Sequence, residues 1–136
     1  MPDINIQIIA GREITALVAA AREVARREFN IGENATITNG YVLNAAIRSL
    51  SGSSADFSDL DYWESVSKAD AAELAPSKVD NVGETMKFRL AGLSGEKLSE
   101  LSQALSEGFG SRIRKNYLVK LVLKAYLIEH RSKQNA

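Results

Sequence analysis

The chain has 136 residues, with 17 Lys and Arg against 17 Asp and Glu, and it contains no Cys and two Pro. This length suits one compact domain or two very small ones, and 45% hydrophobic with 25% charged residues is ordinary for a globular protein. The absence of Cys excludes disulfides and cysteine-bound zinc. No apolar run has the length of a membrane helix and no signal-peptide pattern is present, so we expect a cytoplasmic protein without membrane contact.

Residues 1–50 carry five basic and five acidic residues, and they open with an alternation of apolar and polar side chains. The run Ile4-Asn5-Ile6-Gln7-Ile8 predicts a strand with one buried face. A helix with an apolar stripe follows, formed by Ile14, Leu17, Val18, Ala21, Ala25 and Phe29. After an interruption, Thr36 or Thr38 can cap a second helix. The apolar side of that helix consists of Val42, Leu43, Ala46, Ile47 and Leu50.

Residues 51–84 hold two basic against eight acidic residues, a net charge of −6. Aromatic and apolar residues cluster in this acidic linker at Phe57, Leu60, Tyr62 and Trp63. Residues 69–75 could form a turn or two of helix, which Pro76 ends. We expect the aromatic cluster to pack on the outside of the core while the rest of the linker stays mobile. The alternative is a wholly disordered tether.

Residues 85–136 hold ten basic against four acidic residues, a net charge of +6, and they repeat the order of the first half. The run Met86-Lys87-Phe88-Arg89-Leu90 alternates in the same phase as the first strand. A helix follows, which glycines break at residues 108–110, and its apolar stripe is formed by Leu98, Leu101, Leu105 and Phe109. Ser111 is the expected N-cap of a long final helix. That helix is apolar nearly all round, as expected at the centre of a core.

Each half is therefore predicted to be strand, helix, helix. One such unit cannot stand alone, because a lone strand leaves its backbone groups unpaired and two helices of this size cannot close a core. We predict that the two strands pair antiparallel and that the four helices interlock beneath them. The expected fold is mainly α with a two-stranded antiparallel β-ribbon. In this fold the repeats at residues 1–50 and 85–136 form one pseudo-two-fold domain, joined by the partly ordered acidic linker at residues 51–84.

This order, with a polar-alternating strand and a Gly-x-Ser-type turn before the second helix, resembles the ribbon-helix-helix DNA-binding family. The most specific stretch is Gly110-Ser111-Arg112-Ile113-Arg114-Lys115-Asn116-Tyr117-Leu118, which looks like that family's capped second helix. Two copies in one chain resemble the tandem members, notably the TraY-type relaxosome proteins of conjugative plasmids and the T-DNA-transfer enhancer proteins. The first copy departs from the pattern in a longer loop between its helices, from Asn30 to Ile37. The resemblance implies two ribbon-helix-helix repeats and a role on plasmid or mobile-element DNA.

If the apolar strand residues face the core, then Asn5, Gln7, Lys87 and Arg89 must project from the opposite face. A two-stranded ribbon fits the major groove of B-DNA, where Asn and Gln can pair with adenine while Arg and Lys favour guanine. The two strands carry different base-reading residues, so we expect the chain to read an asymmetric site. The alternative is that the four side chains are merely the solvent face of a hairpin.

Helix N-termini can hold backbone phosphates, because their free amides and the helix dipole favour anions. The candidate phosphate-binding residues are Thr38, Ser111, Arg112, Arg114 and Lys115. Most of this charge belongs to the second repeat, which is therefore expected to hold its half of the site more tightly.

No motif points to an active site, so we predict no catalytic residue, no cofactor and no metal. The predicted function is sequence-specific binding of double-stranded DNA, as a transcriptional repressor or as an accessory protein of plasmid transfer. Further copies on adjacent sites, or relaxosome proteins, are the expected additional partners. The competing hypothesis is an antitoxin-like interaction module whose acidic linker binds a basic partner.

Overall fold

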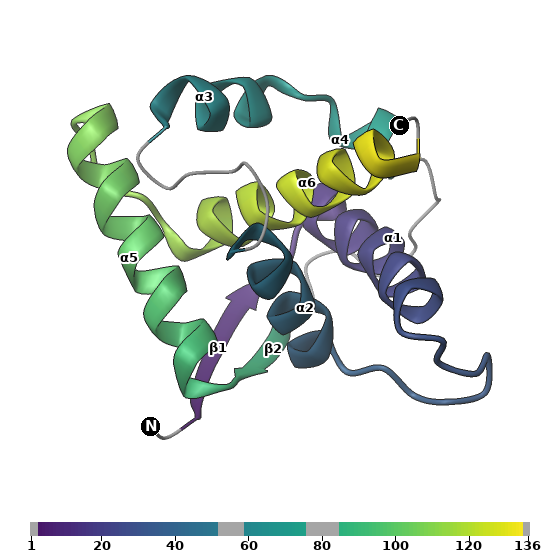
Figure 1. Cartoon of the computed structure of the whole chain (residues 1–136). Coiled ribbons are helices and arrows are strands. Elements are labelled where there is room, and N and C mark those ends of the chain that lie inside the picture. Colours follow the sequence, from purple (N-terminus) through teal and green to yellow (C-terminus); the bar gives the residue numbers. More distant parts are fainter. Residues whose placement is uncertain (1–2, 52–58, 76–84, 135–136) are drawn as a thin grey trace.

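The computed structural model describes residues 3–51, 59–75 and 85–134. This part of the chain is mainly helical, with one two-stranded antiparallel sheet. The elements in chain order are β1 (Ile4–Ile9), α1 (Arg12–Glu28), α2 (Asn39–Ser51), α3 (Leu60–Lys68), α4 (Ala71–Leu74), β2 (Thr85–Leu90), α5 (Gly92–Phe109) and α6 (Lys115–Gln134). Figure 1 shows α6 crossing the middle of the molecule, with the two strands on one side of it and α3 on the other.

The two strands pair antiparallel, with Ile6 opposite Phe88 at the middle of the inner face. The buried side chains of that face are Ile6, Ile8, Phe88 and Leu90, so the alternation predicted for both strands is confirmed. The ends of the face are less covered: Met86 is half-buried, and Ile4 is 37% exposed although it packs over Gly95 in the first turn of α5. Strands far apart in the sequence thus satisfy each other's backbone groups.

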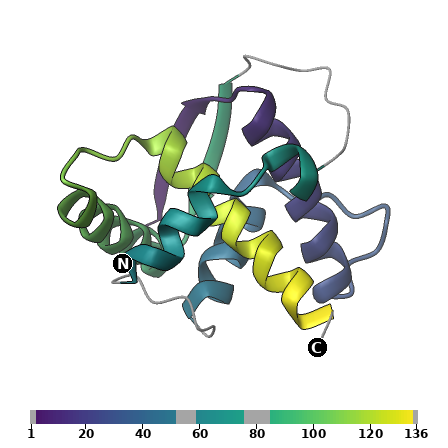
Figure 2. The same cartoon turned by 90° about the horizontal axis from the view of Figure 1, so that it is seen from above.

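Helix α6 forms the centre of the core, as its nearly continuous apolar surface predicts. It packs against α1, α2, α3 and α4. Figure 2 shows it running diagonally through the molecule, with α1 on one side and α5 on the other. Side chains that lie off its main apolar stripe are buried too, namely Val119, Leu123, Tyr126 and Leu127. A helix surrounded by neighbours can bury apolar residues around its whole circumference.

The acidic linker contributes more to the core than its composition predicts. Of the aromatic cluster expected on the outside of the core, Leu60 and Tyr62 are partly buried and pack against the core as expected. The prediction is wrong for Trp63, which is completely buried within the core. The reason is that α3 is amphipathic, and its Trp63 and Val66 face inward while its acids face solvent. The predicted helix within residues 69–75 is confirmed by α4. Phe57, Pro76 and the stretches 52–58 and 76–84 lie outside the described residues.

Polar side chains of α6 fasten α3 and α4 to the core. Lys124 is only 4% exposed, and its Nζ donates hydrogen bonds to the carbonyl oxygens of Ser67 (3.2 Å) and Ala69 (2.8 Å). Burial lowers the pKa of this amine, but carbonyl groups at the C-terminal end of a helix favour a cation. At either side, Tyr62 Oη donates to Glu129 (2.9 Å) and Arg131 donates to the carbonyl oxygen of Glu73 (2.7 Å). The described part of the linker is therefore an integral part of the fold.

Gly40, the second residue of α2, allows this helix to lie directly on β2. A Cβ atom at this position would come within 2.8 Å of the backbone nitrogen of Arg89 and closer still to its carbonyl oxygen. Only glycine avoids this collision, because backbone atoms of a paired strand cannot move aside as a flexible side chain can. The close approach places the N-terminus of α2 beside the outer face of the ribbon.

We therefore expect Gly40→Ala to lower the free energy of unfolding by about 2–3 kcal/mol, as overpacking does. The sign is informative, because alanine in place of glycine inside a helix normally stabilises the protein. The matched control is Gly32→Ala, since a Cβ atom at Gly32 would meet nothing within 4 Å. Urea denaturation of the two variants measures the difference. Equal stability of the two variants would contradict the close packing of α2 on β2.

Candidate nucleic-acid interface

The outer face of the β1–β2 ribbon carries all four predicted base-reading side chains. Asn5 is paired with Arg89 and Gln7 with Lys87, and all four are exposed. Side chains directly opposite each other in an antiparallel pair have Cβ atoms about 5 Å apart. The four therefore form two adjacent polar pairs on one exposed surface, with hydrogen-bonding groups directed away from the core.

Arg89 makes an ion pair on this surface. Its Nε lies 3.2 Å from Oδ2 of Asp3, and the side chains of Arg89 and Asp3 are 77% and 50% exposed. Ion pairs this open to solvent contribute little to stability, in the range of about 0–1 kcal/mol. Asp3 therefore holds the guanidinium over the Asn5 end of the ribbon and would release it at small cost in free energy.

The same face carries a third pair, Ile9 opposite Thr85, which was not predicted as part of the site. Ile9 is 66% exposed, the largest exposure among the described large hydrophobic residues. The residue types alone do not reveal this pair, because the strand ends in Ile8-Ile9 and either isoleucine could face outward. The alternation does reveal it, since Ile9 follows Asn5 and Gln7 at the same two-residue spacing.

The N-terminus of α2 lies at the Asn5–Arg89 end of the ribbon. Thr38 is confirmed as its N-cap, because its Oγ1 accepts a hydrogen bond from the amide of Tyr41 (3.1 Å) and its carbonyl oxygen accepts one from Val42 (3.2 Å). A hollow of about 410 Å³ lies between helix and ribbon. It is lined from the ribbon side by Asp3, Asn5, Lys87, Arg89 and Ala91, and from the helix side by Thr38, Gly40, Tyr41 and Asn44. The predicted phosphate-binding Thr38 and three predicted base-reading residues thus share one hollow.

The N-terminus of α6 lies at the opposite end of the ribbon. Nδ2 of Asn116 donates a hydrogen bond to the carbonyl oxygen of Ile9 (3.0 Å), which joins the first turn of the helix to the end of β1. A second hollow of about 410 Å³ lies here, lined by Gly11, Glu13, Ile14, Arg114, Asn116, Tyr117 and Lys120. The predicted phosphate-binding Arg112, Arg114 and Lys115 are all exposed in this segment, as is Ser111.

The prediction that Ser111 caps the final helix is wrong. Helix α6 begins at Lys115, and the carbonyl oxygen of Arg114 accepts the first helical hydrogen bond, from Leu118 (2.9 Å). The cause is the end of α5. Gly110 adopts a left-handed conformation (φ 71°), and Oγ of Ser106 accepts the amide of Ile113 (3.3 Å), which together keep residues 111–114 out of the helix.

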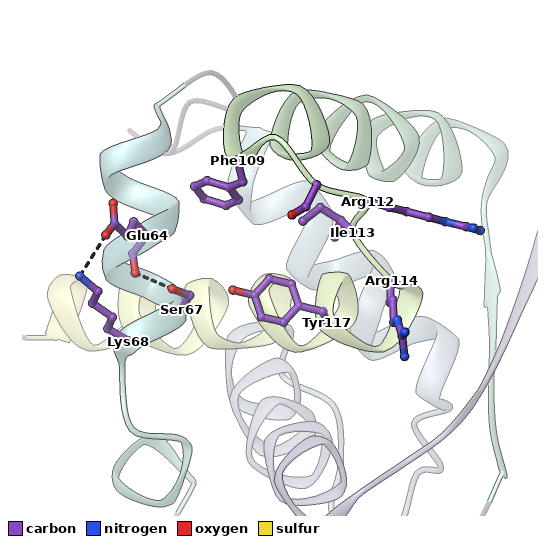
Figure 3. A pocket seen from close by; sticks show the side chains of 9 residues that line it. Glu64, Ser67, Lys68, Phe109, Arg112, Ile113, Arg114 and Tyr117 are labelled. Carbon is purple, nitrogen blue, oxygen red and sulfur yellow. Dashed lines mark hydrogen bonds and ion pairs between the residues drawn. The ribbon is translucent and has the colours of Figure 1, made fainter.

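Residues 111–114 also border a third hollow, of about 700 Å³, between α3 and the end of α5. Figure 3 shows that Phe109, Ile113 and Tyr117 lie toward Glu64, Ser67 and Lys68 of α3 across this hollow. Arg112 and Arg114 point away from those α3 residues. The two guanidinium groups are therefore separated from the acidic side of the molecule.

Two arginines of α1 hold the longer loop between α1 and α2. Nε of Arg22 donates to the carbonyl oxygen of Ile37 (3.1 Å), and its Nη2 donates to Oδ1 of Asn39. Arg26 donates to the carbonyl oxygens of Gly32 and Ala35. Both side chains therefore order the loop that leads into α2. The ribbon cations that share the hollow with the N-terminus of α2 are Lys87 and Arg89.

The acids of the linker that the structure describes lie on the other side of the molecule. Helices α3 and α4 are on the side of α6 away from the strands (Figure 1). Two of the acids cap helices: Asp59 accepts from the amide of Tyr62 (3.1 Å) and Asp70 from the amide of Ala72 (2.9 Å). Glu64 forms an ion pair with Lys68. The negative charge of the described linker residues, 59–75, is thus separated in space from the ribbon.

The described residues contain no group of three or more His, Cys, Asp or Glu that could hold a metal ion. None of the helices in the described ranges is long and apolar enough to cross a membrane. No protein-family model, curated protein or solved structure gives a significant match to this chain.

Proposed function

We propose that this chain binds double-stranded DNA sequence-specifically, with the β1–β2 ribbon lying in the major groove. The observation that carries the proposal is the outer face of the ribbon, where the pairs Asn5–Arg89 and Gln7–Lys87 lie exposed between two helix N-termini. A two-stranded ribbon has the width that the major groove accepts. Asn and Gln can each form two hydrogen bonds to adenine, and Arg and Lys can do so with guanine. The flanking helices supply the phosphate contacts that set the depth and register of the ribbon.

We also propose that the two halves are ribbon-helix-helix repeats related by a pseudo-two-fold axis. Helices α1 and α5 begin 80 residues apart, at Arg12 and Gly92, while α2 and α6 begin 76 residues apart, at Asn39 and Lys115. The shorter second spacing reflects the shorter loop before α6, of residues 110–114 compared with 29–38. In both halves the residue directly before the second helix accepts that helix's first backbone hydrogen bond. Thr38 accepts it from Val42, and Arg114 accepts it from Leu118.

The hollows at the two ends of the ribbon support the same proposal. One is lined by Thr38, Gly40, Tyr41 and Asn44 of the α2 segment, and the other by Arg114, Asn116, Tyr117 and Lys120 of the α6 segment. Each member of the second set lies 76 residues after its counterpart in the first. Three of the four equivalent positions carry different side chains, and only Tyr41 and Tyr117 are alike. The three differences support an asymmetric DNA site rather than a palindrome.

Replacing Arg112, Arg114 and Lys115 together by Ala is expected to weaken binding to all duplexes by a similar factor. These residues would neutralise phosphates and contact no base edge, so the slope of log K against log salt should fall by about 0.9 per lost contact. Fluorescence anisotropy titrations over a series of salt concentrations measure it. Lys68→Ala serves as a control that should leave the slope unchanged, because Lys68 belongs to α3, on the side of α6 away from the strands (Figure 1). A changed base preference with an unchanged salt slope would contradict this assignment.

Selection of bound sequences from random duplex DNA tests the proposed function. We expect one enriched, asymmetric site. Its location in the source DNA separates the two roles, because a repressor site overlaps a promoter and a transfer accessory site lies at a transfer origin. Absence of any enriched sequence would overturn sequence-specific DNA binding.

A further inference from the structure

We infer that Ile9 and Thr85 make the α6 end of the ribbon a reader of thymine methyl groups, an inference that rests on the proposed DNA binding. Both side chains belong to the outer face, directly opposite each other. Thr85 is exposed and Ile9 is 66% exposed, although the inner face of the same strand buries Ile6 and Ile8 almost completely. The β-branched side chain of Ile9 favours the strand conformation, but its apolar surface stays in water and gains nothing from burial in the folded protein.

The two ends of the ribbon differ in chemistry. The Asn5–Arg89 end presents amide and guanidinium groups, whereas the Ile9–Thr85 end presents methyl groups and one hydroxyl. Thymine is the one base whose major-groove edge carries an apolar group, the C5 methyl. Ile9 cannot hydrogen-bond, so a base edge rich in donors and acceptors would lose water without gaining a partner there. Contact with Ile9 therefore favours thymine over the other bases.

The position of Ile9 is fixed from the phosphate-binding side. Its carbonyl oxygen accepts the hydrogen bond from Asn116, in the first turn of α6. Exposed Arg112, Arg114 and Lys115 lie in or just before the same turn. Phosphate contacts made by this segment would press the Ile9 end of the ribbon into the groove, where the methyl of thymine lies.

This arrangement gives the DNA site a direction. The half contacted by the α2 end is read by hydrogen bonds from Asn5 and Arg89, and it should contain adenine and guanine on the contacted edges. The half contacted by the α6 end combines the larger number of cations with an apolar contact, and it should contain one or more A·T pairs whose thymines face Ile9 and Thr85.

Replacement of each thymine of the selected site by deoxyuridine tests the inference with the unaltered protein. The replacement removes only the methyl group and keeps base pairing. We expect at least one thymine in one half of the site to be sensitive, with affinity falling about fourfold, as for the loss of one buried methyl group. Insensitivity of every thymine in a site that the protein does select would overturn the inference while leaving the proposed function intact. Failure to select any sequence would overturn both.

Variants assign the effect to Ile9. Ile9→Ala should bind the thymine duplex about as weakly as the unaltered protein binds the deoxyuridine duplex, and it should show no further loss with deoxyuridine. Ile9→Asn should move the preference at that position from thymine to adenine. Gln7→Ala is the matched control, because it alters the neighbouring pair on the same face and should keep the deoxyuridine effect. An Ile9→Ala protein that remains fully sensitive to deoxyuridine would overturn the assignment.

Discussion

Replacing Lys87 and Arg89 together by Ala is expected to abolish most of the preference for the selected site over random DNA. Each good bidentate base contact contributes about 1–3 kcal/mol of discrimination, so two contacts correspond to a loss of about 30-fold to about 25,000-fold. The fold should be unaffected, because both side chains project from the outer face and bury no surface in the core. Competition titrations with cognate and random duplexes measure the ratio, and circular dichroism verifies folding.

The control must remove the same charge elsewhere. Arg27→Ala combined with Lys68→Ala removes two exposed cations from α1 and α3, away from the ribbon. It should lower affinity slightly for all duplexes and leave the ratio of cognate to random binding unchanged. If the ribbon variant kept its preference, the outer face would be only a solvated surface, and base recognition by the ribbon would have to be abandoned.

The ribbon is the part of the fold that the sequence predicts best, for a simple physical reason. A strand has a side-chain period of two, so Ile6 and Ile8 can be buried only if Asn5 and Gln7 face outward. The same argument, applied to the buried Phe88 and Leu90, places Lys87 and Arg89 on the outer face. Pairing then follows because neither strand has another partner among the described residues.

Helix starts depend on less local information, which explains the error at Ser111. Serine is a common residue at the start of a helix. The chain just after Ser111 is held instead by Ser106 of α5, whose Oγ accepts a hydrogen bond from the amide of Ile113. Thr38 faces no such competition, and it caps α2 as expected. Two similar signals therefore have different outcomes, because only at Ser111 does a nearby amide, that of Ile113, donate a hydrogen bond to a side chain of the preceding helix.

The composition of the acidic linker does not reveal its role in the core, because composition averages the buried and the exposed side of a helix. Asp61 and Glu64 face solvent on α3, while Trp63 between them points into the core. An acidic segment with one inward-facing aromatic residue has the same composition as a mobile tether. Only the position of α3 against α6, a property of the tertiary fold, distinguishes the two.

Trp63→Ala is the variant that measures this difference, and we expect it to lower the free energy of unfolding by about 3–5 kcal/mol. The indole is completely buried, and its ring meets that of Tyr62 edge to face with centroids 5.2 Å apart. Urea denaturation followed by circular dichroism gives the value. Tyr62→Phe is the matched control, since it keeps that ring contact and removes only the hydroxyl that bonds Glu129, with an expected loss of about 1 kcal/mol.

The two variants together decide whether α3 belongs to the cooperative unit. A loss below about 1 kcal/mol for Trp63→Ala would mean that α3 detaches without unfolding the rest, because a core tryptophan cannot be removed so cheaply. The expected large loss instead means that α6, and with it the cationic segment before its first turn, is held in place by the linker. In that case destabilising the far side of the molecule should reduce the folded fraction able to bind DNA. The base preference of that fraction should stay unchanged, because the ribbon and α3 lie on opposite sides of α6 (Figure 1).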